Sequence, residues 1–132
     1  MSAAENKELV RKMFGELSKG NAEAFMASLA DDVRFTIIGT SKYSGTYTGK
    51  EDLVKRLLGP LNAQLEGGLA ITPGNLIAEG EYVAMQSNGR AKSKNGVDYN
   101  NTYCQVFHIV NGKVKEMTEY LDTELVTRAF GK

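Results

Sequence analysis

The chain has 132 residues, with 16 basic and 16 acidic side chains that give zero formal net charge at neutral pH. This length suits a single domain, residues 1–132, that buries roughly two thirds of its unfolded surface. Balanced charge lacks the long-range positive field of a protein that binds nucleic acid. The single cysteine, Cys104, excludes an internal disulfide. No stretch approaches the roughly 18 apolar residues of a membrane span, and the charged N-terminus lacks a signal-peptide core, so we expect a cytoplasmic protein.

Two helices and a strand are predicted first. Ser2-x-x-Glu5 is a capping box, and the apolar residues after it recur at helical spacing until Gly20. Asn21 then caps a short second helix. Residues 33–37 alternate as a strand.

The next segment is irregular before it becomes helical. Residues 39–49 are rich in turn formers and predict a loop or an irregular hairpin. Thr48-x-x-Glu51 is a second capping box, opening a third helix that runs to Leu58. Gly59-Pro60 is expected to kink or break that helix.

Four strands follow. Their predicted ranges are 70–78, 82–91, 99–109 and 114–122, separated by the turn signals Glu79-Gly80, Asn95-Gly96 and Asn111-Gly112. Residues 123–130 fit either a helical tail or an extension of the last strand. The order α-α-β-α-β-β-β-β predicts an α+β domain with helices on one face of a curved antiparallel sheet.

Glu119 is the most informative single residue. It stands between Met117 and Leu121, at a position that alternation turns toward the helices. Burying a carboxylate costs hydration free energy, so such a residue is expected either to be paired or to have a functional role. We therefore predict Glu119 at the centre of a pocket. One histidine, one cysteine and carboxylates on opposite faces of a strand make no metal site, so none is expected.

The turn at Asn111-Gly112 decides which neighbours accompany Glu119. A two-residue turn places Cys104 opposite Glu119, whereas a three-residue turn with Gly112 in a bulge brings Tyr103 and Gln105 to that face. The bulged form is favoured because it also turns the more hydrophobic side of the strand toward the helices. The pocket residues expected from these two strands are then Asn101, Tyr103, Gln105, Met117, Glu119 and Leu121.

Family motifs occur along nearly the whole chain. They are Val10-x-x-Met13-Phe14, the runs 19–25 and 29–33, Tyr47-x-Gly49-Lys50-Glu51, Asn111-Gly112-Lys113-Val114-x-Glu116 and Glu119-Tyr120-x-Asp122. In this order they resemble the SnoaL-like, ketosteroid-isomerase-related branch of the nuclear transport factor 2-like superfamily. The resemblance implies a cystatin-like cone, with a curved antiparallel sheet wrapped around three helices and an apolar pocket that needs no cofactor. It also implies a homodimer through the convex sheet face.

The resemblance does not include the steroid-isomerase catalytic set. The tyrosine and the aspartate base of those enzymes fall near Met13 and Ile37 here, and neither side chain transfers a proton. The acid that helps to hold their oxyanion falls at Tyr103 or Cys104, and a tyrosine there could still donate a hydrogen bond. Polyketide cyclases of the SnoaL type also depend on an acidic pocket residue, a role open to Glu119.

Two functional hypotheses of different class follow. The first is a cofactor-independent isomerase, cyclase or hydrolase acting on a small hydrophobic, oxygen-bearing molecule, with Glu119 and Tyr103 as catalytic residues. The second is a non-catalytic ligand-binding or accessory module. A lesser third is a structural dimer whose cavity is filled by its own side chains. Further lining is expected from Met13, Ile37, Tyr43 and Tyr47.

Overall fold

The structure is a computed structural model that describes residues 1–132. Its helices are α1 (Ala3–Ser18), α2 (Ala22–Ala27), a continuous helical segment made of α3 (Lys50–Leu53), η1 (Val54–Leu58) and α4 (Gly59–Ala63), and α5 (Thr123–Phe130). Its strands are β1 (Leu29–Ile37), β2 (Gly45–Thr48), β3 (Leu65–Glu79), β4 (Tyr82–Ser93), β5 (Thr102–Val110) and β6 (Lys113–Leu121). The fold is the predicted α+β class, with a six-stranded sheet.

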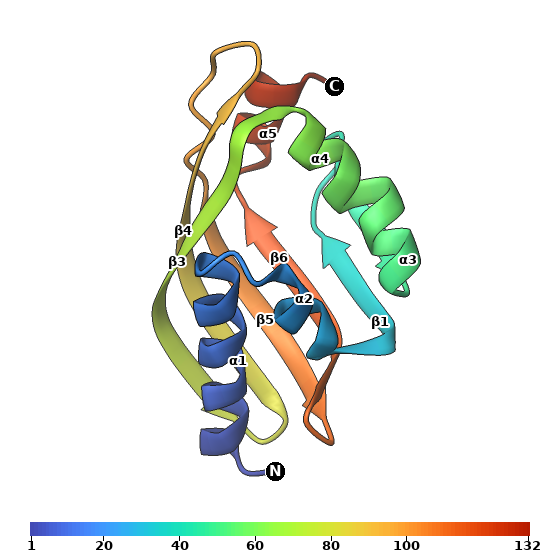
Figure 1. Ribbon diagram of the computed structural model, residues 1–132, viewed down its shortest axis with the longest axis vertical. Coiled ribbons are helices and arrows are strands. Elements are labelled where there is room, and N and C mark those ends of the chain that lie inside the picture. Colours follow the sequence, from blue (N-terminus) through green and yellow to red (C-terminus); the bar gives the residue numbers. More distant parts are fainter.

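The sheet has the strand order β2-β1-β6-β5-β4-β3. Figure 1 shows α1 and α2 on one face of it, with the helical segment α3–α4 over the β1 side and α5 at the end where the chain finishes. One pair corrects the expectation of a wholly antiparallel sheet, because β1 and β6 run parallel. Most of the chain lies between β1 and β6, so no hairpin connects them and their connection does not force an antiparallel arrangement.

Both predicted N-terminal caps are confirmed. The Ser2 hydroxyl accepts from the Glu5 backbone N–H at 3.1 Å, and the Glu5 carboxylate accepts from the Ser2 backbone N–H at 2.9 Å. The Asn21 side chain accepts from the Ala24 N–H at 3.1 Å and opens α2. Each cap satisfies backbone donors that have no partner inside the helix.

The second predicted capping box is wrong. Helix α3 begins at Lys50 after Gly49, whose φ of 86° requires glycine, and no side chain caps it. The carboxylate that reaches back is Asp52, which accepts from the Thr48 backbone N–H at 2.9 Å. The helix starts one residue later than Thr48 would place it, so Asp52 and not Glu51 occupies the third helical position.

Gly59-Pro60 does not end the helix. The turn before it widens, and the Gly59 N–H donates to the Val54 carbonyl five residues back. Pro60 then lies in the first turn of α4, where a missing N–H is tolerated. A side chain at Gly59 would lie 3.0 Å from the Val54 carbonyl oxygen, so this close turn favours glycine.

The segment before α3 is the irregular hairpin that was predicted as an alternative to a loop, because it contains β2, which pairs with β1. Strand β1 begins at Leu29 and β3 at Leu65, earlier than the predicted residues 33 and 70. Strand β5 begins at Thr102, because residues 94–101 form a longer connection closed by a bridge between Lys92 and Asp98. Residues 123–130 form a helix, capped by the Asp122 side chain.

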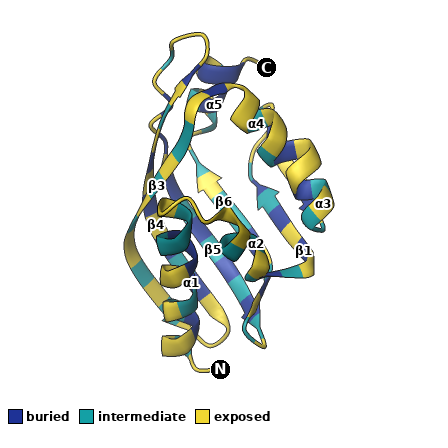
Figure 2. Ribbon diagram, in the orientation of Figure 1, coloured by how far each residue is buried: buried dark blue, intermediate teal, exposed yellow.

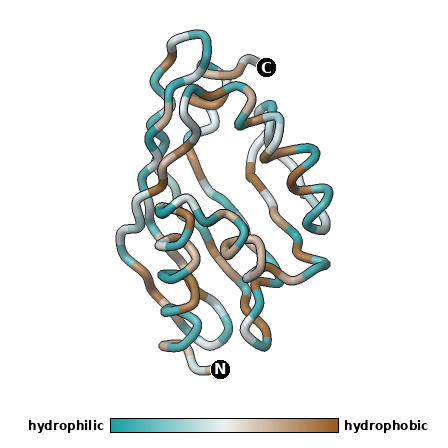
Figure 3. Tube along the Cα trace, in the orientation of Figure 1, coloured by the Kyte–Doolittle hydropathy of each residue, from teal (hydrophilic) through white to brown (hydrophobic).

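The apolar core lies between the sheet and the helices. It contains 22 buried residues, including Val10, Phe14, Met85 and Phe107. Figure 2 shows buried positions alternating with exposed ones along the strands, and Figure 3 shows the same alternation in hydropathy. No helix is both long and apolar enough to cross a membrane.

Candidate functional site

A cavity of about 400 Å³ lies between the concave face of the sheet and the helices. Of its 24 lining residues, 20 are hydrophobic, and the other four are Gly59, Asn62, Gln105 and Glu119. Two larger hollows, of about 580 and 640 Å³, are more open and more polar. Binding sites for small molecules are usually enclosed and apolar with a few polar groups, so the least open and most apolar of these three hollows is the candidate site.

Glu119 lies on the sheet side of this cavity. Its strand is central, and it is paired with Ile37 of β1 and Gln105 of β5. Glu119 as a residue is half-buried, and it lines the cavity. Burial raises the pKa of Glu119 to about 7, opposed by the hydrogen bond from Gln105. Both protonation states of Glu119 are therefore populated near neutral pH.

Gln105 and Ser87 form a chain of hydrogen bonds that positions this carboxyl group. Gln105 Nε2 donates to Glu119 Oε1 at 3.1 Å, and Ser87 Oγ donates to Gln105 Oε1 at 2.8 Å. Gln105 and Ser87 are both buried. Because the Ser87 hydroxyl occupies the Gln105 oxygen, the amide nitrogen is directed at Glu119.

Two tyrosines lie beside Glu119. Tyr103 faces Leu121 across the β5–β6 pair, and its ring fits over Gly89, where a Cβ atom would lie 2.8 Å from Tyr103 Cε2. The Tyr99 hydroxyl accepts from Asn101 Nδ2 at 3.3 Å. Burial raises the pKa of both phenols, and the Glu119 charge raises each further. Both hydroxyls therefore stay protonated and can act as hydrogen-bond donors.

Sequence reasoning missed Tyr99 as a lining residue. Tyr99 has the same parity as Asn101, Tyr103 and Gln105, so the alternation that selected those three also pointed to it. In the structure Tyr99 precedes β5, yet it keeps the inward side that this parity indicates. Tyr99 is buried against Phe130 of α5, with ring centroids 4.8 Å apart.

The predicted register is confirmed, but its cause differs. Gln105 is opposite Glu119, and Tyr103 is on the same face. The turn itself has two residues, since Val110 pairs with Lys113, and the shift occurs between His108 and Ile109 of β5. The extra residue therefore lies in β6 and not at Gly112. A bulge at either place changes the parity of the pair in the same way.

Of the residues that sequence reasoning assigned to the pocket, most line it. They are Ile37, Tyr43, Tyr103, Gln105, Met117, Glu119 and Leu121. Tyr43, Tyr103 and Met117 are buried apart from their cavity surface. What these residues do in the cavity stays a prediction.

Three predicted lining residues do not line it. Asn101 is buried. Its side-chain oxygen accepts from the Asp122 N–H at 3.1 Å, and its Nδ2 donates to the Asp122 carbonyl at 3.0 Å, so Asn101 closes the end of the β5–β6 pair. Met13 is buried in the core, because the cavity side of α1 is formed by Phe14 and Leu17. Tyr47 turns away from the cavity, into the contact between β2 and the helical segment.

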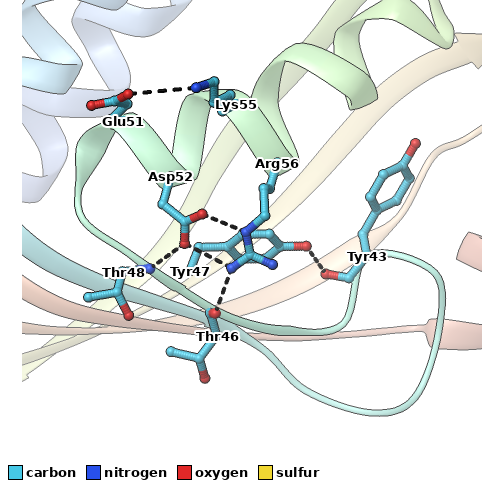
Figure 4. Close-up of polar contacts among 8 residues, drawn as sticks. All are labelled: Tyr43, Thr46, Tyr47, Thr48, Glu51, Asp52, Lys55 and Arg56. Atoms are coloured by element: carbon cyan, nitrogen blue, oxygen red, sulfur yellow. Dashed lines mark hydrogen bonds and ion pairs between the residues drawn. The ribbon is translucent and has the colours of Figure 1, made fainter.

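Figure 4 shows the contact that contains Tyr47. The Tyr47 hydroxyl donates to the Tyr43 carbonyl at 2.7 Å, and the Arg56 guanidinium lies 4.7 Å from the Tyr47 ring centre. Arg56 also donates to Asp52 and to the Thr46 carbonyl. Since Arg56 follows Val54 and precedes Leu57 and Leu58 of the cavity wall, this cluster fixes the wall to the sheet edge.

Comparison with known proteins places the chain. No curated protein matches it in sequence. Among solved structures, an NTF2-like protein of unknown function from Burkholderia pseudomallei is 21% identical, with a TM-score of 0.85 and 100% of both chains covered. A protein with a cystatin-like fold from Xanthomonas campestris gives the same three values. TerC, co-crystallised with polyporic acid, is 19% identical, with a TM-score of 0.82 over 96% of this chain and 98% of TerC.

These similarities show the fold alone, because each identity is low. The family follows from sequence: the model of the SnoaL-like domain matches residues 10–117. That range includes β1, the strand β5 that carries Gln105, and most of β6, up to two residues before Glu119. The chain therefore belongs to the SnoaL-like family.

Proposed function

We propose that the cavity binds a small hydrophobic, oxygen-bearing molecule and that Glu119 transfers a proton to or from it without a cofactor. The reaction is of the isomerase, cyclase or hydrolase type. The observation that carries this proposal is a carboxyl group in an apolar cavity with a pKa of about 7 and one hydrogen bond. A group with that pKa gives up and regains a proton at small cost near neutral pH.

The neighbours of Glu119 have distinct roles in this proposal. Gln105 holds one carboxyl oxygen, so the other, Oε2, is left for the ligand. The Tyr103 hydroxyl, with Tyr99 beside it, donates a hydrogen bond to oxygen that gains negative charge as the proton moves. Tyr103 and Glu119 are then the catalytic residues, and Gln105 is a positioning residue.

A ligand-binding module without chemistry is the second candidate. The observation in its favour is that the positions of the steroid-isomerase tyrosine and aspartate fall near Met13 and Ile37, both of them apolar. Met13 is part of the core and Ile37 is part of the cavity wall. Glu119 is then a recognition group that binds a polar end of the ligand.

The titration of Glu119 tests the enzyme proposal. Carbon-13 NMR of the Glu119 carboxyl should give a pKa near 7, and Glu119→Gln should abolish turnover of any substrate found while leaving the protein folded. A carboxyl group that titrates like an exposed glutamate would contradict the proposal. Turnover that survives Glu119→Gln would leave only the binding function.

A thermal-shift screen tests the cavity itself. Terpenoid, steroid and polyketide-like compounds are suitable because they are apolar and carry oxygen. A ligand at a hundred times its dissociation constant should stabilise the fold by about 2.7 kcal/mol. TerC, a relative in fold, was crystallised with polyporic acid, which supports including oxygen-bearing aromatic compounds.

Assembly and location complete the proposal. We propose a homodimer through the convex sheet face, on which Tyr82 and Tyr120 are large exposed side chains. We also propose a cytoplasmic location, supported by the free thiol of Cys104. Light scattering on the purified chain tests the homodimer.

A further inference from the structure

Glu119 has no cationic partner. None of the 24 residues that line the cavity is a lysine, an arginine or a histidine. The eight ion pairs of the protein involve other residues. Its hydrogen bond from Gln105 is neutral and occupies one oxygen. The ionised carboxylate is therefore an uncompensated negative charge inside an apolar cavity.

The nearby cations are held elsewhere. Arg56 is engaged by Asp52 and by the Tyr47 ring, and Lys42 donates to the Phe130 carbonyl at 3.3 Å. Neither side chain lines the cavity. A ligand that enters with a negative charge would therefore meet the Glu119 charge at low dielectric with nothing to screen it.

The aromatic rings of the lining favour the opposite sign. Tyr43, Tyr99 and Tyr103 line the cavity with Phe35, and aromatic ring faces attract cations. Glu119 Oε2 accepts a hydrogen bond when the carboxyl is ionised, and a charged donor makes the stronger bond. A protonated amine would supply the compensating charge that the protein lacks.

We infer that the cavity discriminates against negative charge: it binds hydrophobic molecules whose polar end is a hydrogen-bond donor, either an ammonium or a hydroxyl group, and it rejects anions. The donor binds Glu119 and the hydrocarbon part lies against the apolar wall. This inference rests on the proposed function, because it assigns the ligand class of the same cavity.

Four naphthalenes that differ in one substituent provide the test. They are 2-methylnaphthalene, 2-naphthalenemethanol, 2-naphthylmethylamine and 2-naphthoate, measured by titration calorimetry or fluorescence at about pH 8, where Glu119 is ionised. The amine and the alcohol should each bind at least about tenfold more tightly than the naphthoate. 2-Methylnaphthalene reports on the hydrocarbon part alone.

Glu119→Gln should alter this ranking in a specific way. Binding of the amine should weaken and binding of the naphthoate should strengthen, while 2-methylnaphthalene binds as before and shows that the cavity is intact. Glu116→Gln is the matched control. Glu116 is exposed on the outer face of the same strand, so this substitution removes the same charge outside the cavity. It should leave all four affinities unchanged.

The outcomes separate the inference from the proposed function. Naphthoate binding as tight as that of the alcohol, or a ranking that Glu119→Gln leaves unchanged, would overturn the charge selection alone. Failure of every naphthalene, 2-methylnaphthalene included, would overturn it together with the ligand-binding cavity.

Discussion

Glu119 and Gln105 lie directly opposite each other across the β5–β6 pair. A hydrogen bond of 3.1 Å joins them, and Gln105 is the one hydrogen-bond partner of the Glu119 carboxyl group. Gln105 is buried and cannot exchange this bond for one to bulk water. The proton affinity and the orientation of Glu119 therefore both depend on this amide.

Gln105→Leu should raise the pKa of Glu119 above 7. The Gln105 hydrogen bond stabilises the ionised carboxylate and lowers the pKa, so its loss acts in the opposite direction. Carbon-13 NMR titration measures the change. Ser87→Ala is the control: it removes a bond to Gln105 and leaves the bond to Glu119, so its effect should be smaller. A Glu119 pKa that falls in Gln105→Leu would refute this assignment.

The stability of the protein should fall as pH rises through the range set by Glu119. Its folded pKa, about 7, is above the value of 4.5 that it has when exposed, so the folded state binds the proton more tightly. The stabilising effect of protonation is complete below about pH 4.5 and is lost by about pH 7, a change of up to about 3 kcal/mol.

Urea unfolding of the wild type and of Glu119→Gln at several pH values isolates this contribution, because the other titrating groups are shared. The stability advantage of Glu119→Gln should grow between about pH 5 and pH 8 and then level off. A difference that is independent of pH would show that Glu119 titrates alike in the folded and unfolded states.

Gly89→Ala should destabilise the fold by about 1–3 kcal/mol and reduce ligand binding. The new Cβ atom would lie 2.8 Å from the Tyr103 ring and 3.2 Å from Leu69 Cδ1, and both side chains line the cavity. Chemical denaturation and binding assays measure the two effects. Gly15→Ala in α1 is the matched control: no atom lies within 4 Å of its Cβ position, so it should stabilise by up to about 1 kcal/mol.

Asn101→Ala should cost about 1–3 kcal/mol of stability and leave the Glu119 titration in place. The Asn101 amide makes two bonds to the Asp122 backbone, at the residue that caps α5, and it does not line the cavity. Thermal unfolding and the NMR titration measure the two properties. Normal stability with weakened ligand binding would instead return Asn101 to the ligand-contacting role expected from sequence.

Local chemistry made much of this fold predictable. The Ser2 and Asn21 caps and the parity of β5 relative to Glu119 follow from side-chain rules that act over a few residues. The place of Glu119 was predictable because alternation in a strand fixes its face, and a buried carboxylate needs a reason to be there.

Relationships between distant segments were not predictable in the same way. The pairing of Ile37 with Glu119 joins strands far apart in sequence, and no local pattern encodes its parallel direction. Strand β2 has four residues in a turn-rich segment, too few for alternation to be detected. Asn101 and Tyr47 are residue types that often contact ligands, but their polar atoms are used inside the protein. The Asn101 amide bonds the Asp122 backbone, and the Tyr47 hydroxyl donates to the Tyr43 carbonyl while Arg56 covers the Tyr47 ring.

Strand β6 lies inside the sheet, with β1 on one side and β5 on the other, and the Glu119 carbonyl accepts from the Ile38 N–H at 3.2 Å. The acid thus lies on a strand that is hydrogen-bonded on both sides, while the opposite wall of the cavity is helical. Substitutions at Leu57, Leu58 or Leu61 can therefore reshape the space offered to a ligand without displacing the proton-bearing group. New ligand preferences can arise on that wall around an acid that keeps its place.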